Sequence, residues 1–263
     1  MATSDAPTPF SRTWAATVTV GNGSHVSFGA TGTVLYSHYG QLGNGTTADT
    51  SLAVLVAGGV GFDSVRASIG RTCAVTGAGV AYCWGSNTGG LLAVSDTASL
   101  VLMPSAVVGG QVFSRLEAGA DAGTACGLTP AGDAYCWGGN GWGQLGDGTT
   151  TDRTAPTLVS GGLSFGAIAV GGQHTCGITT AGAAYCWGLN SSGQLGSGST
   201  TDSHVPSPVS GGLAFRAITA GDEFTCALAT DQRLYCWGAN FYGQVADGTT
   251  QNRSVPTRLL YQP

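Results

Sequence analysis

Trp137-Gly-Gly-Asn-Gly-Trp-Gly-Gln-Leu-Gly-Asp-Gly-Thr-Thr150 is the most informative segment of the sequence, because it returns fifty residues later as Trp187-Gly-Leu-Asn-Ser-Ser-Gly-Gln-Leu-Gly-Ser-Gly-Ser-Thr200. Aromatic residues on either side recur at the same interval. Phenylalanines repeat every 50 to 52 residues and tryptophans every 50 to 53, at Phe10, Phe62, Phe113, Phe165 and Phe215, and at Trp84, Trp137, Trp187 and Trp237. Such self-similarity indicates a repeat architecture. We interpret the chain as five units, at about residues 10–61, 62–112, 113–164, 165–214 and 215–263.

Each unit predicts about four short β-strands. In the fourth unit, β-type runs such as 167–170, 174–179 and 184–187 are separated by turn residues such as Gly161-Gly162. Short strands at regular spacing, without a sustained helical period, are typical of propeller blades. We therefore predict an all-β fold, a single β-propeller of about five four-stranded blades that occupies residues 1–263.

The two ends of the chain predict how the ring closes. The repeat carries a proline nine residues before its phenylalanine, at Pro104, Pro156 and Pro206. Phe10 has only Met1 at this distance, so the first unit lacks a leading strand, which residues 255–260 supply. We expect 255–260 to complete the blade begun at Phe10 by pairing near Trp14, which leaves no long free sheet edge. An open fragment of a larger ring is the alternative.

The eight cysteines form four pairs with a spacing of ten: Cys73 with Cys83, Cys126 with Cys136, Cys176 with Cys186, and Cys226 with Cys236. If residues 180–182 form a three-residue hairpin loop, Cys176 lies opposite Cys186 within disulfide range. The same register sets a Gly or Ala opposite each Tyr that precedes the second cysteine. Metal ligation and ordinary buried thiols are the alternatives, but this spacing is not a Cys-x-x-Cys pattern. We predict four disulfides and an extracellular, cell-surface or periplasmic location.

Charge and hydropathy limit the classes of partner. The chain has nine arginines, no lysine and a net charge of −5, so it carries no dense basic patch for nucleic acid. Its longest apolar run, 51–62, is about twelve residues long and is interrupted by glycines. A membrane helix needs ~20 residues, so we expect no membrane span. Residues 1–10 show no signal-peptide pattern.

Residues that could carry chemistry form no recurring set. Gly141-Trp-Gly-Gln-Leu-Gly146 matches the dinucleotide pattern G-x-G-x-x-G, but it opens no helix and is interpreted as a turn. Asn44, Asp147 and Asp247 stand beside glycine, where they are expected to hydrogen-bond nearby backbone. His174 is interpreted as a tolerated strand residue. We predict no catalytic residue, no metal ligand and no cofactor, because neither a matched triad nor a carboxylate pair recurs.

The motif Cys-Trp-Gly-x-Asn-x-x-Gly-Gln-Leu-Gly-x-Gly-Thr-Thr resembles the regulator of chromosome condensation (RCC1-like) repeat in its cysteine-bearing bacterial form. The resemblance covers essentially the whole chain and implies a β-propeller. Members usually close with seven blades, whereas this sequence supplies five. The eukaryotic namesake is a nucleotide exchange factor for a small GTPase, so the resemblance also implies an exchange-factor-like regulator as an alternative function.

Positions that break the repeat predict the functional surface. The two residues before Gly-Gln-Leu-Gly or its variant include Tyr39, Trp142, Phe241 and Tyr242, and equivalent loop tips in a ring share one face. Exposed aromatic rings are typical of binding surfaces. Packing of the rings on neighbouring blades is the alternative. The second unit carries Gly-Leu-Leu-Ala in place of Gly-Gln-Leu-Gly, so residues 89–103 are expected to form a side contact.

These observations predict a non-enzymatic extracellular binding or scaffold protein that uses the loop face of a β-propeller for a protein or glycan ligand, with self-association as a further option. A hydrolase or lyase with a pocket at the propeller axis is the alternative. Convergent carboxylates or histidines at the axis would favour the enzyme.

Peptide mapping under non-reducing conditions tests the disulfide prediction. Because each pair is expected within one hairpin, every linked peptide should join cysteines ten residues apart, as in Cys176 and Cys186. Alkylation before reduction should label no cysteine. A peptide that links Cys83 to Cys126 would contradict the register.

Overall fold

The computed structural model describes residues 16–17, 27–28, 38–50, 52, 54–119 and 123–260. These residues form four four-stranded antiparallel sheets and one short strand pair. The pair is β1 (Ala16–Thr17) and β2 (Ser27–Phe28), and the first sheet is β3 (Ser64–Ser68), β4 (Arg71–Val75), β5 (Ala81–Ser86) and β6 (Leu100–Ala106). The second sheet is β7 (Arg115–Ala118), β8 (Ala125–Leu128), β9 (Ala134–Gly138) and β10 (Arg153–Leu158). The third sheet is β11 (Phe165–Val170), β12 (His174–Thr179), β13 (Ala184–Gly188) and β14 (Ser203–Pro208), and the fourth is β15 (Phe215–Ala220), β16 (Phe224–Ala229), β17 (Leu234–Gly238) and β18 (Arg253–Arg258).

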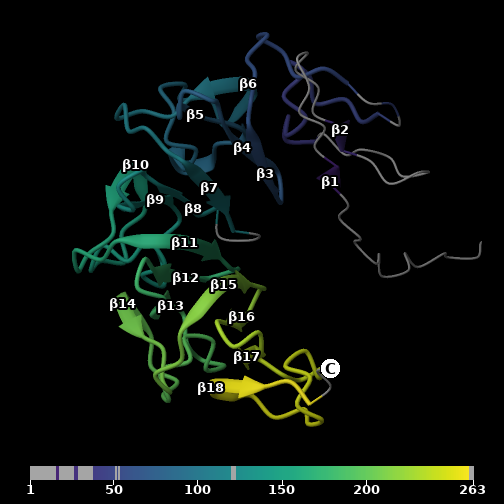
Figure 1. Ribbon diagram of the computed structural model, residues 1–263. Coiled ribbons are helices and arrows are strands. Elements are labelled where there is room, and N and C mark those ends of the chain that lie inside the picture. Colours follow the sequence, from purple (N-terminus) through teal and green to yellow (C-terminus); the bar gives the residue numbers. More distant parts are fainter. Residues whose placement is uncertain are drawn as a thin grey trace, which may run out of the picture.

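The four sheets follow one another along an arc in chain order (Figure 1). Within each sheet the strands are antiparallel and adjacent in sequence, as in a propeller blade. The first strands β3, β7, β11 and β15 contact one another from sheet to sheet. They therefore line the inner side of the arc, and the fourth strands lie on its outer side.

The hairpin register expected from the cysteines is confirmed. In β12 and β13, Cys176 pairs with Cys186 and Ile178 with Ala184. The turn is closed by a bond from the Gly182 amide to the Thr179 carbonyl, and Gly182 has a φ of 89°, which favours glycine.

All four expected disulfides are present, with Cα–Cα separations of 4.0 to 4.1 Å. Each lies within one sheet and joins its second strand to its third. The bonds join Cys73 to Cys83, Cys126 to Cys136, Cys176 to Cys186, and Cys226 to Cys236. The described part of the chain contains no free cysteine. The spacing of ten is thus the consequence of one repeated hairpin.

The small residues opposite the tyrosines make room for the phenylalanine of the first strand. Gly177 pairs with Tyr185, and a Cβ on Gly177 would lie 2.5 Å from the Phe165 ring. Phe165 in turn packs against the buried Trp187, with ring centroids 5.8 Å apart. The same arrangement in the other sheets gives Phe–Trp centroid separations of 5.6 to 6.1 Å. Each sheet therefore carries its own aromatic core.

The predicted closure of the ring is wrong for the described residues. Strand β18 pairs with β17, with Tyr235 opposite Arg258, and so completes the fourth sheet instead of the blade begun at Phe10. Phe10 and Trp14 lie outside the described residues, which contain four four-stranded blades and not five. The error has a physical cause. The proline-bearing strand is the outer edge of the preceding sheet. Proline has no amide N–H, and an edge strand tolerates this because its outer side needs no hydrogen bond to another strand.

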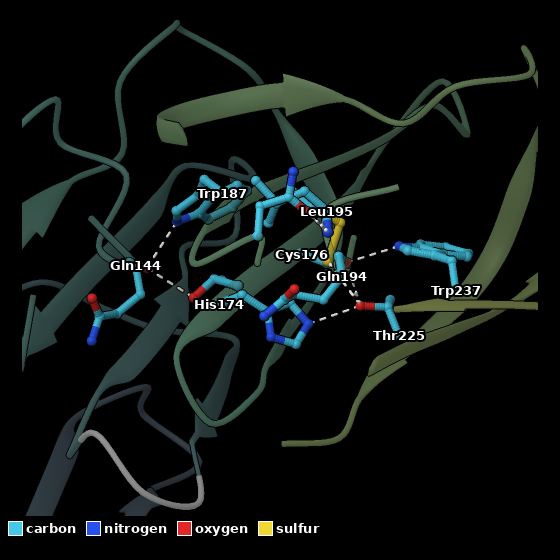
Figure 2. The surroundings of a disulfide bond; sticks show 11 residues. Gln144, His174, Cys176, Trp187, Gln194, Leu195, Thr225 and Trp237 are labelled. Carbon is cyan, nitrogen blue, oxygen red and sulfur yellow. Dashed lines mark hydrogen bonds between the residues drawn. A yellow bond between two sulfur atoms is a disulfide. The ribbon is translucent and has the colours of Figure 1, made fainter. Parts of the chain in front are cut away.

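One backbone carbonyl joins each regular pair of neighbouring sheets. The Gln144 carbonyl accepts hydrogen bonds from Trp187 Nε1 (2.9 Å) and Thr175 Oγ1 (2.8 Å), both on the next sheet (Figure 2). Two equivalent joints have the Gln41 carbonyl with Trp84 and Thr72, and the Gln194 carbonyl with Trp237 and Thr225. In this way each Gly-Gln-Leu-Gly loop anchors the aromatic core of the sheet that follows.

The joint between the first and second sheets departs from this pattern. Trp137 is fully buried, but its Nε1 atom has no hydrogen-bond partner among the described residues. Thr124 instead donates to the Gly139 carbonyl at 2.8 Å. The loop that should supply the acceptor carries Leu91 in the position of the glutamine.

A pair of tryptophan substitutions measures what the shared carbonyl contributes. Trp187→Phe removes a buried N–H donor from the Gln144 carbonyl, whereas Trp137→Phe makes the same change where no protein acceptor is bonded. In a low-salt buffer we expect Trp187→Phe to lower the free energy of unfolding by about 1 kcal/mol more than Trp137→Phe does. Chemical denaturation followed by circular dichroism checks this. Equal losses would contradict a stabilising role of the bond.

Candidate binding face

Two kinds of connection leave each sheet at the same end. In the third sheet, the first residue of β12, His174, pairs with the last residue of β13, Gly188. The turn before β12 and the loop after β13 therefore lie together. The loop face is the end of the sheets formed by loops 38–50, 87–99, 139–152, 189–202 and 239–252 and by turns 69–70, 171–173 and 221–223.

A buried asparagine organises four of the five loops from within. The Asn140 Oδ1 atom accepts a bond from the Leu145 amide (3.0 Å), and its Nδ2 atom donates to the Thr149 carbonyl (3.1 Å) and the Thr151 carbonyl (2.9 Å). Asn87, Asn190 and Asn240 make the corresponding bonds. This asparagine recurs in the motif, but no role for it was expected from the sequence. The hydrogen bonds of this amide give the four loops a common backbone shape.

An Asp–Arg pair fixes two of the loops further. Asp147 accepts from the Thr149 amide (2.9 Å) and from Arg153 Nε (2.7 Å), and Asp247 has the same partners in Thr249 and Arg253. Burial would raise the pKa of Asp247, but hydrogen bonds from Thr249 and Arg253 outweigh it and lower the pKa to about 2. The expectation that these residues hydrogen-bond nearby backbone is confirmed. Asn44 does the same with the Thr46 amide (3.2 Å).

All four predicted aromatic residues lie on the loop face. Exposed fractions are 48% for Tyr39, 44% for Trp142, 64% for Phe241 and 94% for Tyr242. The loop glutamine holds each tip, because Gln144 Oε1 accepts from the Trp142 amide at 2.9 Å and the corresponding bonds hold Tyr39 and Tyr242. These rings therefore stand on backbone that is already ordered.

Tyr39 is also a packing residue. A Cβ on Gly70 of the next sheet would lie 2.9 Å from the Tyr39 ring, so the ring rests on that turn. The alternative of rings that pack on neighbouring blades thus holds in part for Tyr39. Phe241 and Tyr242 are the more exposed pair, and they are adjacent on one loop.

The loop that carries Phe241 and Tyr242 differs from the others in what covers it. In the joined loops, a Cβ on Gly143 or Gly193 would collide with the next sheet's outer strand, at His204 or Ser254. A Cβ on Gly243 would meet only a carbonyl of its own loop, 4.0 Å away. Within the described part of the chain, this surface of the 239–252 loop is open.

Residues 89–103 do not form one long loop. The short 3₁₀ helix η1 (Thr88–Gly90) begins the segment, and its last residues belong to β6. Asn87 keeps the same internal bonds as Asn140. Met103 is 53% exposed on the outer strand. The side contact expected for this segment stays a prediction.

His174 is more than a tolerated strand residue. It is fully buried, and its Nε2 atom lies 2.8 Å from Thr225 Oγ1 on the next sheet (Figure 2). The direction of this hydrogen bond depends on the tautomer of the imidazole, because the Thr225 hydroxyl also lies 3.0 Å from the Gln194 carbonyl. Burial lowers the pKa of His174 to about 4. Phe224 occupies the same position in the fourth sheet, where the ring packs against Gly221 as the His174 ring does against Gly171.

The two glutamates are held by other side chains. Glu117 accepts from Arg66 (2.8 Å) and Arg115 (3.0 Å), which joins β3 to β7 on the inner side of the arc. Glu223 accepts from Ser192 Oγ at 3.1 Å. In the ranges that the structure describes, no group of three or more His, Cys, Asp or Glu residues is arranged to hold a metal ion. No helix in those ranges is long and apolar enough to cross a membrane.

Comparison with known families matches the repeated part of this geometry. The pattern described as the regulator of chromosome condensation (RCC1) repeat matches residues 131–178, 181–228 and 231–262, and a second pattern of that description matches 167–194 and 215–244. The chain belongs to the RCC1 repeat family. The matched residues include strands β9 to β18, and each of the four described blades has a disulfide in its hairpin.

Individual relatives match part of their own length. The ultraviolet-B receptor UVR8 of Arabidopsis thaliana is 33% identical over 167 residues, which are 60% of this RCC1-type chain and 38% of the receptor. The structure of human WBSCR16 has 19% identity and a TM-score of 0.76, and covers 90% of this chain and 64% of that chain. The structure of Prp20p of Saccharomyces cerevisiae has 16% identity and a TM-score of 0.74, and the match covers 90% of this chain and 58% of Prp20p. The chain thus spans less than two thirds of these relatives, and the two structures support an RCC1-like propeller arrangement.

Burial of neutral His174 predicts a specific sensitivity to acid. With a folded pKa of about 4 against 6.5 in the unfolded chain, the unfolded state binds more protons between these values. The stability is therefore fully present above pH 6.5 and is lost as the pH falls towards 4, by up to about 3 kcal/mol. His174→Phe, the residue found at position 224, should lose less stability over this range than the wild type. Urea unfolding at pH 7 and pH 4.5 measures the difference. Equal losses would contradict a buried neutral imidazole.

Proposed function

We propose that this RCC1-type chain is a non-enzymatic, extracellular protein-binding module and that Phe241 and Tyr242 anchor its partner. The observation that carries the proposal is the exposure of two adjacent rings, 64% for Phe241 and 94% for Tyr242, on a loop whose backbone is internally bonded. RCC1-like propellers commonly mediate protein binding, and this loop offers the largest exposed aromatic surface on the loop face.

Binding through such rings is favourable for two physical reasons. Each buried aromatic side chain removes about 150–250 Å² from water, and its few rotatable bonds limit the entropy lost on binding. The bonds from Asn240 to the Thr249 and Gln251 carbonyls order the loop before any partner arrives. Little further ordering is needed, so most of the contact energy can appear as affinity.

Trp142 and Tyr39 extend the proposed surface along the same face. They lie on loops of other units, and each is about half exposed. Part of the Tyr39 ring already packs on Gly70, so its contribution to binding should be smaller than that of Tyr242. A ligand that contacts several loops at once must be large. The spread of the aromatic residues over several loops therefore favours a folded protein over a small molecule as the partner.

Location and the lack of chemistry are part of the same proposal. Four disulfides in four consecutive blades are typical of proteins from an oxidising compartment. Prp20p, whose structure is described together with its binding to Gsp1p and histones, is an RCC1-like propeller that binds proteins. The exposed loop face supports a scaffold role. Glu117 and Glu223 are each hydrogen-bonded to other side chains, which does not favour a hydrolase that would use them as catalytic carboxylates.

The repeat itself supplies a fold-preserving test variant. Ser191 and Ser192 occupy the positions of Phe241 and Tyr242 in the preceding unit, whose loop has the same internal bonds. Phe241→Ser/Tyr242→Ser should therefore fold normally and melt within a few degrees of the wild type. Leu158→Ser is the matched control, because Leu158 is 51% exposed at the opposite end of its sheet.

Immobilised wild-type protein and both variants are compared for proteins retained from the surface fraction of the source cells, and the affinity of each retained protein is then measured. We expect a partner that binds the wild type and Leu158→Ser alike, and binds the double serine variant at least about thirtyfold more weakly. Unchanged affinity of the double variant would contradict the assignment. Binding to a glycan array that is lost in the double variant, without a protein partner, would contradict the protein class.

A further inference from the structure

The irregular joint between the first and second sheets contains two unpaired buried donors. Trp137 Nε1 and Arg71 Nη1 are both buried without a hydrogen-bond partner among the described residues. Arg71 begins β4, in the position that His174 has in β12, and its guanidinium lies against Gly123, which precedes β8 of the second sheet. Each of the three regular joints has one carbonyl acceptor where this joint has none.

A single residue explains why the acceptor is missing. In the regular joints a glycine follows the leucine of the loop, and a Cβ there would lie 2.6 to 2.7 Å from the indole nitrogen at Gly43, Gly146 and Gly196. The loop of the second unit has Ala93 at this position, with a φ of 56°. If this loop had the same position as in the regular joints, the Ala93 methyl group would collide with the indole nitrogen of Trp137. The loop therefore stands away from the indole, and the Leu91 carbonyl accepts no bond from it.

The separation opens a small cavity. It measures about 10 Å³ and is lined by residues that include Ser68, Arg71, Leu91, Leu92, Thr124 and Trp137. A volume of this size is about what one water-sized ligand occupies. The Thr124 hydroxyl proton is already donated to the Gly139 carbonyl. The cavity is therefore lined by one cationic group, the Arg71 guanidinium, and by one unpaired neutral donor, the indole N–H of Trp137.

A partly buried guanidinium without a counter-charge is unfavourable. Desolvation lowers the pKa of Arg71, and no carboxylate from the described residues faces it. Glu117, the glutamate of the neighbouring strand, is already paired with Arg66 and Arg115. Removing part of a charge from water is unfavourable unless an opposite charge compensates for it. Leu91 and Leu92 exclude water from one side, which strengthens attraction to any anion that enters.

We propose that this joint binds one small inorganic anion of the size of chloride, held by the Arg71 guanidinium and the Trp137 indole N–H. The anion takes the place of the carbonyl that accepts the indole bond in the other joints. It neutralises Arg71 and links the first sheet to the second. The site is independent of the aromatic loop tips and of the proposed partner.

Thermal unfolding of the full chain in sodium chloride and in sodium gluconate, at equal ionic strength, tests the site. A bound anion stabilises the folded state in proportion to the logarithm of its concentration. The unfolding midpoint of the wild type should rise by several degrees as chloride replaces gluconate. Arg71→Thr, with the residue found at position 124, should abolish the rise. Arg216→Thr removes an exposed arginine on β15 and should keep it.

A crystal soaked in sodium bromide locates the ion directly. We expect one anomalous peak within hydrogen-bond distance of Arg71 and Trp137 in the wild type and none there in Arg71→Thr. A chloride response that persists in Arg71→Thr, or a water molecule in place of the peak, would overturn the proposal.

A second variant tests whether a carboxylate is the counter-charge instead. Asp121 lies outside the described residues, two positions before Gly123. If Asp121→Asn destabilises the protein as much as Arg71→Thr does and chloride has no effect on the wild type, the counter-charge is this carboxylate and the anion site is wrong.

Discussion

The rest of the structure depends on one backbone carbonyl in each regular joint that accepts two donors from the neighbouring sheet. A carbonyl oxygen has two lone pairs, and those of Gln144 are both used, by the Trp187 indole and the Thr175 hydroxyl. The arrangement buries the tryptophan completely without leaving its N–H unpaired. It also fixes the position of the Gly-Gln-Leu-Gly loop. Cohesion of the blades and rigidity of the loop face therefore have the same source, and the loop tips inherit an ordered backbone from it.

Alanine replaces the last glycine of the loop in two units. Ala93 and Ala246 both have this position, with φ values of 56° and 55°. At Ala93 the neighbouring sheet is present, and the displaced loop leaves Trp137 unpaired beside a small cavity. At Ala246 the described residues place no sheet over the loop, and Phe241 and Tyr242 stand exposed. The altered joint beside Ala93 and the exposed rings on the loop that contains Ala246 are the two places where we propose binding.

Local repetition made much of the fold accessible from the sequence. The ten-residue spacing specifies the hairpin because residues that face each other in a hairpin lie equally far from the centre of its turn. Cys176 and Cys186 meet this condition. The pairing of small residues with tyrosines follows from the same register. Assignment of the proline strand failed because a strand can join the sheet before it or the sheet after it, and sequence distance does not distinguish the two. The structure places 253–258 beside β17. The role of Asn140 was also missed, since its partners are backbone carbonyls nine and eleven residues away, which carry no side-chain signal.

By itself, the sequence determined the repeat, the blade hairpins, the four disulfides and the positions of the variable aromatic residues, because each depends on contacts within about fifty residues. Only the tertiary structure decided which of these aromatic rings remain exposed, which sheet each edge strand joins, and which buried donors stay unpaired. Exposure of Tyr242 and packing of Tyr39 on Gly70 depend on what the next sheet covers. The missing bond of Trp137 depends on a methyl group of Ala93, which lies 44 positions away in the chain. Steric exclusion between neighbouring sheets is a property of the assembled arc, and no single repeat encodes it.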